Sequence, residues 1–263
     1  MGSDRAAAAS WTARTTAETY ERGRPDYPES AIDFVLVPVR DRPGLRALDL
    51  GAGTGKLTRR LTDRGVDTVA VEPADGMRAV LARAVPAAAV LPGSAEAIPL
   101  PAGSIDVVVA GQAFHWFDRA AALAEIARVL RPAGVLGIIY NARDDAVAWV
   151  RALSEIIGET GDHASVTRDY QPPDLGPVFE PAEVFRTEHE QPLDARSLVD
   201  LVASRSYAIA MPPAERVRLL DRVAGLARSH PALVGRQHFS MPYVTTVERH
   251  RLADPAPGGP DGR

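Results

Sequence analysis

The chain has 263 residues, of which 46% are hydrophobic, enough for one sizeable core with an appendage. It contains no cysteine, which excludes disulfides, thiolate metal sites and cysteine nucleophiles and fits a reducing, cytoplasmic location. The net charge is −4 and no block of Lys or Arg stands out, which argues against a nucleic-acid partner. No apolar run approaches the roughly 20 residues that cross a bilayer, and the first residues lack a signal-peptide core. We therefore expect a protein that is neither embedded in a membrane nor secreted.

The two ends have the composition of disordered segments. Residues 1–10 are small and polar, and residues 253–263 are rich in Pro and Gly. Between them, residues 45–140 alternate short apolar runs with segments of helical periodicity. We predict strands at 45–50, 67–71, 87–91, 105–110 and 135–140, and helices at 55–64, 75–84 and 119–130. This order is typical of β-α units, so the predicted fold class is α/β, with a doubly wound, mostly parallel sheet whose first three strands are buried on both faces.

Beyond residue 145 the rhythm changes. We expect a helix near 145–158, a loop over 161–177, a strand at 184–191, helices at 195–206 and 213–229, and an edge strand at 240–250. Asp144 and Asp145 precede the first of these helices, so we interpret them as an N-cap and predict no metal site. This half is expected to complete the sheet and to add a helical cap over its carboxyl edge.

The densest motif is LDLGAGTGKL at residues 48–57, where a predicted strand runs through a glycine loop into a helix. Gly51, Gly53 and Gly55 allow the backbone to approach a ligand without an intervening Cβ atom. The helix that follows presents unpaired N–H groups to a polar or anionic ligand group. Glu72 stands at the end of the next strand, where an acid binds both hydroxyls of a ribose. Together these features predict a nucleoside-containing ligand.

Spacing distinguishes three kinds of site that share this layout. A phosphate-binding GxxxxGK[ST] loop would need Gly at position 50 and Ser or Thr at position 57, and both are Leu. A dinucleotide GxGxxG loop would need Gly where Lys56 stands, which weakens an NAD-dependent oxidoreductase as the alternative. Asp49 precedes the loop by two residues, where it would attract a cationic amino group and repel a pyrophosphate. An amino-acid-bearing nucleoside therefore fits better.

Four segments resemble the class I S-adenosylmethionine-dependent methyltransferases: LDLGAGTGKLTRRL, VAVEP, PGSAEAIPLPAGSIDVVVAGQAFHWFD and ARVLRPAGVLGIIY. The AFHWF run is similar to the branch that includes trans-aconitate-type carboxyl methyltransferases, and the similarity covers roughly 11–250. The resemblance implies a seven-stranded Rossmann-like sheet and methyl transfer from S-adenosylmethionine to a small molecule, with S-adenosylhomocysteine as product. It also implies a tail and lid over 1–28, a methyltransferase domain over 29–250 with its cap at about 145–235, and a disordered tail over 251–263.

The resemblance assigns roles to individual residues. The glycine loop would hold the methionine moiety, Glu72 the ribose, and Met77 with residues 94–96 the adenine, although the family often has Asp where Ser94 stands. The N-terminal segment would fold over the cofactor. The cofactor-binding residues expected on this basis are Tyr20, Arg24, Asp49, Gly51, Ala52, Gly53, Gly55, Glu72, Met77, Ser94, Ala95, Glu96 and Gln112.

The aromatic run after the fourth predicted strand holds the candidate catalytic residues, His115 and Trp116. Packing is the alternative for both, and His115 is interpreted as a substrate contact or, alternatively, as a general base. Arg205, in the expected cap, is a candidate to hold a carboxylate through two hydrogen bonds. The favoured acceptor is a carboxylate or a hydroxyl group, and the alternative is a protein that retains the cofactor without transferring methyl, a cyclase or an inactive binder. Monomer and homodimer both stay open.

Overall fold

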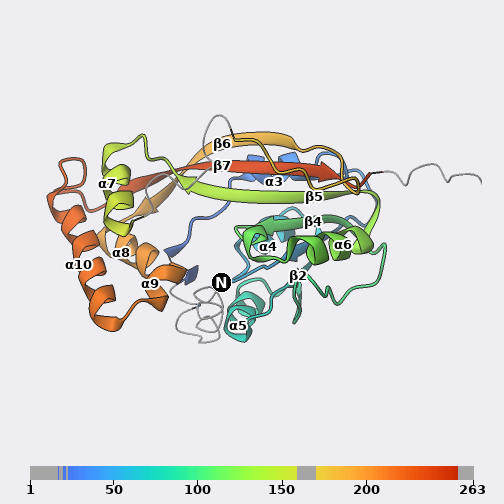
Figure 1. The fold of residues 1–263 in the computed structure, drawn as a ribbon, viewed down its shortest axis with the longest axis horizontal. Coiled ribbons are helices and arrows are strands. Elements are labelled where there is room, and N and C mark those ends of the chain that lie inside the picture. The colour runs from blue at the N-terminus through green and yellow to red at the C-terminus, as the bar shows by residue number, and fades with distance from the viewer. Residues whose placement is uncertain (1–16, 18–19, 22, 159–169, 254–263) are drawn as a thin grey trace, which may run out of the picture.

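The structure is a computed structural model that describes residues 17, 20–21, 23–158 and 170–253. Of the predicted tail and lid over 1–28, only residues 17, 20–21 and 23–28 are described, and of the predicted tail over 251–263 only residues 251–253. The loop predicted at 161–177 is described from residue 170 onward. The described strands form a seven-stranded sheet in the order β3-β2-β1-β4-β5-β7-β6 (Figure 1). They are β1 (Arg46–Leu50), β2 (Asp67–Val71), β3 (Ala89–Leu91), β4 (Ile105–Gly111), β5 (Leu130–Arg143), β6 (Glu183–Leu193) and β7 (Phe239–Arg251).

The sheet is mixed. Strands β3, β2, β1, β4 and β5 pair in parallel, while β7 is antiparallel to both of its neighbours, β5 and β6. The strand order reverses between β1 and β4. In doubly wound sheets this reversal opens a crevice at the carboxyl ends of the two strands, and ligands bind there.

Helices cover both faces of the sheet. They are α3 (Glu29–Leu36), α4 (Lys56–Thr62), α5 (Asp75–Ala84), the 3-10 turn η1 (Phe114–Trp116), α6 (Arg119–Val129), α7 (Ala148–Ile157), α8 (Ala195–Ala203), α9 (Ser206–Ala210) and α10 (Pro213–Ser229). Apolar residues of α3 and α4 pack on one face of the central strands, and those of α6 pack on the other. Strand residues alternate between these two cores because successive side chains point to opposite faces.

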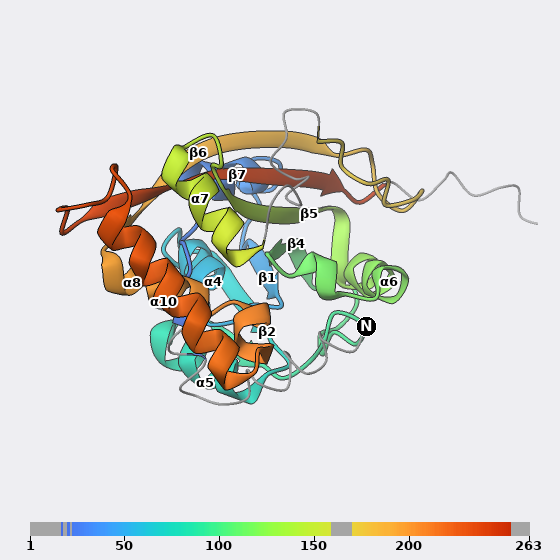
Figure 2. The ribbon, with the colours of Figure 1, turned by 60° about the vertical axis from the view of Figure 1, so that its left-hand side comes forward.

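Helices α7, α8 and α10 share a separate apolar core, which also includes Tyr243 and Met241 of β7. Together with α9 they form the helical cluster, which lies at one end of the long strands β5, β6 and β7 (Figures 1 and 2). Helix α8 begins with a capping box in which the Asp194 carboxylate accepts from the Ser197 N–H. None of the helices in the described part of the chain has the length and hydropathy that a bilayer crossing requires.

Several sequence-based expectations need correction. The strand predicted at the edge, 240–250, is the interior strand β7, and β6 forms the edge. The predicted strand 87–91 shrinks to β3, which is exposed to half-buried because it lies at the other edge. The predicted helix 195–206 is interrupted between α8 and α9. Asp144 and Asp145 do not cap α7: the N-cap is Val147, and the two carboxylates accept from the Ala146 N–H and from the Ser154 hydroxyl instead.

Candidate active site

A pocket opens at the carboxyl ends of β1, β4 and β5, at the point where the strand order reverses. Its walls come from the glycine loop, the end of β4, strand β5, the helical cluster and the chain before α3. We call residues 20–21 and 23–28 the N-terminal segment. The lining residues are Tyr20, Arg24, Pro25, Tyr27, Asp49, Gly51, Ala52, Gly53, Thr54, Lys56, Leu57, Gly111, Gln112, Asn141 and Arg205. Seven of the expected cofactor-binding residues are therefore brought together: Tyr20, Arg24, Asp49, Gly51, Ala52, Gly53 and Gln112.

The glycine loop requires its glycines for two different reasons. Gly51, Gly53 and Gly55 all have positive φ, at 70°, 57° and 89°, a conformation that favours glycine. A Cβ atom on Gly51 would lie 2.8 Å from the Ala113 Cβ, and one on Gly55 would lie 2.8 Å from the Leu81 Cγ, so these two allow tight packing. A Cβ atom on Gly53 would meet nothing within 4 Å. Gly53 therefore leaves bare backbone facing open space in the pocket.

Asp49 is the buried acid of the pocket. It lies on β1 with 1% of its surface exposed, and its carboxylate accepts from the Thr58 hydroxyl at 2.6 Å. Burial, with a smaller contribution from the negative charge of Glu72, raises the pKa of Asp49 to about 7. A cationic ligand group beside it would favour the ionised form. The pocket therefore contains a buried carboxyl group that a cationic ligand group would ionise and pair with.

Glu72 follows β2 and braces the glycine loop. Its carboxylate accepts from the Gly53 N–H at 2.9 Å and from the Ala74 N–H at 2.8 Å, and burial raises its pKa. It does not belong to the pocket lining, but each of its oxygens has a second lone pair. Its predicted contact with a ribose stays a prediction.

The residues expected to bind adenine lie beyond the lining of the pocket. Met77 is buried in a small apolar cluster that Tyr20 also contacts. Ser94 pairs with Ala97 in an isolated bridge. Ala95 belongs to a core beneath the sheet, and the Glu96 carboxylate accepts from the Asp118 N–H at 2.9 Å. For these four residues a contact with adenine stays a prediction. Gly55, expected with the other loop glycines at the methionine moiety, also lies outside the pocket lining and packs on α5, so its contact with the methionine moiety stays a prediction.

Gln112 has an unusual backbone at the end of β4. Its φ is 54°, which is uncommon for a residue other than glycine, and its N–H donates to the Ile139 carbonyl at 2.9 Å. Its side-chain amide donates to the Asn141 carbonyl at 2.5 Å. Strained conformations of this kind gather at ligand-binding sites, where the surrounding contacts hold them. Gln112 thus turns the chain out of β4 into the pocket wall.

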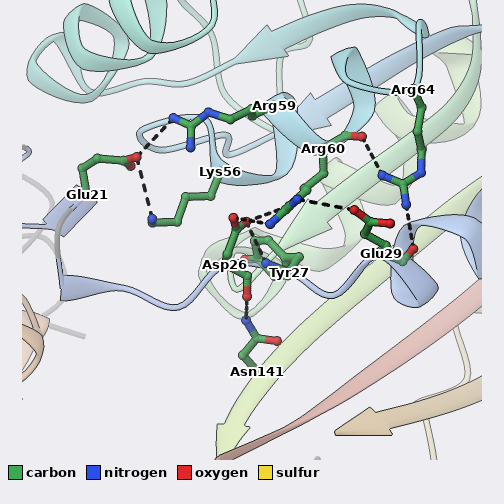
Figure 3. Close-up of polar contacts among 9 residues, drawn as sticks. All are labelled: Glu21, Asp26, Tyr27, Glu29, Lys56, Arg59, Arg60, Arg64 and Asn141. Atoms are coloured by element: carbon green, nitrogen blue, oxygen red, sulfur yellow. Dashed lines mark hydrogen bonds and ion pairs between the residues drawn. The ribbon is translucent and has the colours of Figure 1, made fainter. Parts of the chain in front are cut away.

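Ion pairs tie the N-terminal segment to α4 (Figure 3). Glu21 lies 3.2 Å from Arg59 and 3.7 Å from Lys56. Asp26 makes two hydrogen bonds with the guanidinium of Arg60, at 2.6 and 3.2 Å. These pairs place the segment along the helix that follows the glycine loop, so the segment crosses the same site that the loop forms.

The other side of the N-terminal segment contacts the sheet and the helical cluster. The Asn141 amide donates to the Asp26 carbonyl at 3.0 Å, and the Gln191 amide donates to the Gly23 carbonyl at 3.2 Å. Gly23 approaches α8 so closely that a Cβ atom on it would lie 2.8 Å from the Asp200 carbonyl oxygen. The segment is therefore packed between the sheet, α4 and α8.

His115 and Trp116 lie in η1 and outside the pocket lining. Both are exposed, Trp116 at 38%, and their rings are 5.2 Å apart, whereas the adjacent Phe114 is buried in the core. Their roles in catalysis stay predictions. Arg205, by contrast, lies between α8 and α9 and lines the pocket because the helix predicted over 195–206 breaks there. Within the described residues, no group of His, Asp and Glu is arranged to bind a metal ion.

Sequence reasoning did not single out Asn141 as a pocket residue. The available signal was a polar residue in the apolar run VLGIIYNAR of β5, on the strand that flanks β4. Tyr27 is buried, and it also lines the pocket beside Gly111, where a Cβ atom would lie 2.5 Å from the Tyr27 hydroxyl oxygen.

Comparisons with known proteins agree with this arrangement. Residues 48–138 match the methyltransferase domain family. An uncharacterized methyltransferase of Mycobacterium tuberculosis is 49% identical over 234 residues, which cover 89% of this chain and 93% of that protein. The structure of a candidate type II methyltransferase from Anaeromyxobacter dehalogenans has a TM-score of 0.63 over 87% of this chain and 97% of that one, at 23% identity.

A further similar structure comes from Haemonchus contortus. It is a phosphoethanolamine N-methyltransferase in complex with phosphomonomethylethanolamine and S-adenosylhomocysteine, with a TM-score of 0.51 over 92% of this chain and 58% of that one, at 15% identity. These two structures share the fold with this chain. Taken with the sequence relatives, the match places the chain in the methyltransferase family with the class I, Rossmann-like fold, and the protein is an enzyme of that family.

Proposed function

We propose that this protein binds S-adenosylmethionine in the pocket and transfers its methyl group to a small-molecule acceptor. The observation that carries the proposal is the pairing of the buried Asp49 carboxyl with the bare backbone of Gly53 in one pocket. A carboxylate suits the amino group of a methionine moiety, and the glycine leaves space where a side chain would stand. The residues present therefore fit this cofactor.

The protein's own residues would bind the cofactor, orient it toward the acceptor and exclude water from the site. When bound, S-adenosylmethionine would supply an electrophilic methyl carbon on its sulfonium: an acceptor nucleophile would bond to that carbon as the carbon–sulfur bond breaks, with S-adenosylhomocysteine as the leaving group. Asp49 would hold the amino group, and the N-terminal segment, with Tyr20 and Arg24, would cover the site and exclude water from it. Gln112 and Asn141 would set the orientation of the wall at the ends of β4 and β5.

A carboxylate is the acceptor group that the pocket favours. Arg24 and Arg205 both line it, and a guanidinium can bind a carboxylate through two parallel hydrogen bonds. Of the described residues that line the pocket, none is a histidine. A carboxylate is already ionised at neutral pH and needs no base, whereas a hydroxyl acceptor would need one.

A labelled-methyl experiment tests this function and its alternative. The protein is incubated with a metabolite extract and methyl-deuterated S-adenosylmethionine, and Gly53→Val serves as the matched control. We expect a labelled methylated product, formed together with an equal amount of S-adenosylhomocysteine, and neither with the variant. Tight binding of S-adenosylmethionine without any S-adenosylhomocysteine formed from it would instead indicate a cyclase or an inactive binder.

A further inference from the structure

Three polar side chains on neighbouring strands form a hydrogen-bonded chain beneath the N-terminal segment. Asn141 of β5 lies opposite Thr245 of β7, and His189 of the edge strand β6 lies opposite Tyr243, two residues along β7 from Thr245. The Thr245 hydroxyl oxygen is 2.7 Å from Asn141 Oδ1 and 3.1 Å from His189 Nδ1. Asn141 Nδ2 is 3.0 Å from the Asp26 carbonyl oxygen. The chain thus runs from the sheet edge to the segment that covers the pocket.

Each hydrogen bond in this Asp26–Asn141–Thr245–His189 network has only one possible donor. The Asp26 carbonyl only accepts, so the Asn141 side chain must present its NH₂ group to Asp26 and its oxygen to Thr245. A threonine hydroxyl has a single proton, and the Asn141 oxygen needs it. His189 must therefore donate from Nδ1 to the Thr245 oxygen. The neutral imidazole then has its proton on Nδ1 and a lone pair on Nε2.

The surroundings of His189 agree with this tautomer. Its Nε2 atom is buried and has no hydrogen-bond partner among the described residues, so a proton there would be an unsatisfied donor. Burial lowers the pKa of His189. Hydrogen bonding to the Asp26 backbone and the negative charge of Asp26 oppose this shift without cancelling it. The ring also stacks on Tyr243, with centroids 5.4 Å apart. His189 is held as a neutral donor.

We propose that His189 and Thr245 are positioning residues for methyl transfer, because they fix the Asn141 amide and, through it, the N-terminal segment over the pocket. The proposal rests on the proposed function of that pocket. Asn141 lines the pocket itself, and its backbone carbonyl accepts from the Gln112 side-chain amide, so the walls from β4 and β5 meet at this one residue. Neither His189 nor Thr245 lines the pocket. Both act on it through Asn141.

The tautomer of His189 is tested without any ligand. The full chain is labelled with ¹⁵N-histidine, and long-range ¹H–¹⁵N spectra are recorded at about pH 7.5 with His189→Asn for assignment. We expect a protonated Nδ1 and an unprotonated Nε2 at His189. The opposite pattern would overturn the direction of the chain and with it the proposal.

Two pairs of variants test the positioning role by calorimetric titration with S-adenosylhomocysteine. Thr245→Val removes the hydroxyl at nearly constant volume, and Thr245→Ser keeps it. We expect about two- to tenfold weaker binding for Val, the usual worth of one hydrogen bond, and near wild-type binding for Ser. Thr68→Val is the control, because Thr68 is a buried strand threonine whose hydroxyl donates to the Val66 carbonyl away from the pocket.

The second pair of variants, at His189, tests the same role if Thr245→Val does not fold. His189 is only half-buried, so His189→Leu should fold, lose the donor and weaken binding, whereas His189→Asn keeps an N–H near Nδ1 and should retain binding. If wild type binds S-adenosylhomocysteine and both Val and Leu bind like wild type, the positioning role is wrong. If wild type does not bind it at all, the proposed function of the pocket is wrong, and the positioning role falls with it.

Discussion

At the scale of single residues, Asp49 decides how the pocket responds to pH. Its pKa of about 7 means that a bound ammonium must draw a proton off it in slightly acid solution. We expect the Kd for S-adenosylhomocysteine to fall by at most about tenfold per pH unit as pH rises toward 7. Binding should weaken again only in alkaline solution, where the ligand's own amino group loses its charge.

Calorimetric titrations across this range check the expectation. Asp49→Asn is the matched variant, because its amide oxygen can still accept from Thr58 while the charge is gone. The variant should bind more weakly and with no rise in affinity between acid and neutral pH. A wild-type affinity that is flat over the same interval would show that Asp49 does not receive the amino group.

The same burial makes Asp49 a source of instability in the free protein. In the unfolded chain the carboxyl ionises near 3.8, in the folded protein near 7, so between these values only the unfolded state releases its proton. The free energy of unfolding therefore falls as pH rises from about 4 to 7 and then levels, by at most about 4 kcal/mol. Asp49→Asn should be more stable than wild type at about pH 8 and gain little at about pH 4. Denaturant titrations without ligand measure this difference, and equal stability at both pH values would contradict it.

His115 offers a test of the acceptor class. It is exposed and outside the pocket lining, so we expect His115→Asn to slow single-turnover methyl transfer by no more than about tenfold. With a carboxylate acceptor the rate should be flat between about pH 6 and 8, because the acceptor stays ionised. Rates are measured at saturating cofactor once an acceptor is known. A rise through the histidine range that vanishes in the variant would make His115 a general base and the acceptor a hydroxyl or an amine.

At the scale of elements, the N-terminal segment depends on its close approach to α8. A Cβ atom on Gly23 would lie within 3.0 Å of the backbone at Asp200 and Leu201, which has little freedom to move. Gly23→Ala should therefore displace the segment, at about 1–3 kcal/mol of strain, and weaken binding of S-adenosylhomocysteine. Gly225→Ala in α10 is the control: a Cβ atom there meets nothing within 4 Å, so it should leave binding unchanged and stabilise the helix. Equal affinities for the two variants would show that the contact with α8 does not matter for the pocket.

The elements around the glycine loop could be predicted from sequence because their signals are local. Strands β1 and β2 and helices α4 and α5 all lie where periodicity and the loop motif place them. Strand β7 was misplaced, because its alternation suggested a solvent-facing edge. Its polar residues Glu248 and His250 are in fact 1% exposed, and Glu248 accepts from the Tyr170 hydroxyl. Alternating polarity cannot distinguish solvent from internal partners that come from distant parts of the chain.

At the scale of the whole molecule, the pocket joins parts of the chain that lie far apart in sequence. The glycine loop with Asp49 could be predicted, since spacing alone separates it from phosphate and dinucleotide loops. The contributions of Asn141 and of the chain near Gly23 depend on strand order and on the packing of α8, which no local pattern encodes. The local sequence also did not predict the break between α8 and α9, where Arg205 reaches the pocket.

The central claim is that this pocket binds S-adenosylmethionine or its product, and calorimetric titration of wild type and Gly53→Val with S-adenosylhomocysteine and with NAD tests it most directly. Gly53 has φ 57° and open space before it, so a valine would strain the loop and fill the pocket. We expect micromolar binding of S-adenosylhomocysteine by wild type, NAD weaker by about a hundredfold or more, and loss of binding in a variant that still unfolds cooperatively. NAD binding of equal strength, or unchanged S-adenosylhomocysteine binding in Gly53→Val, would contradict the claim.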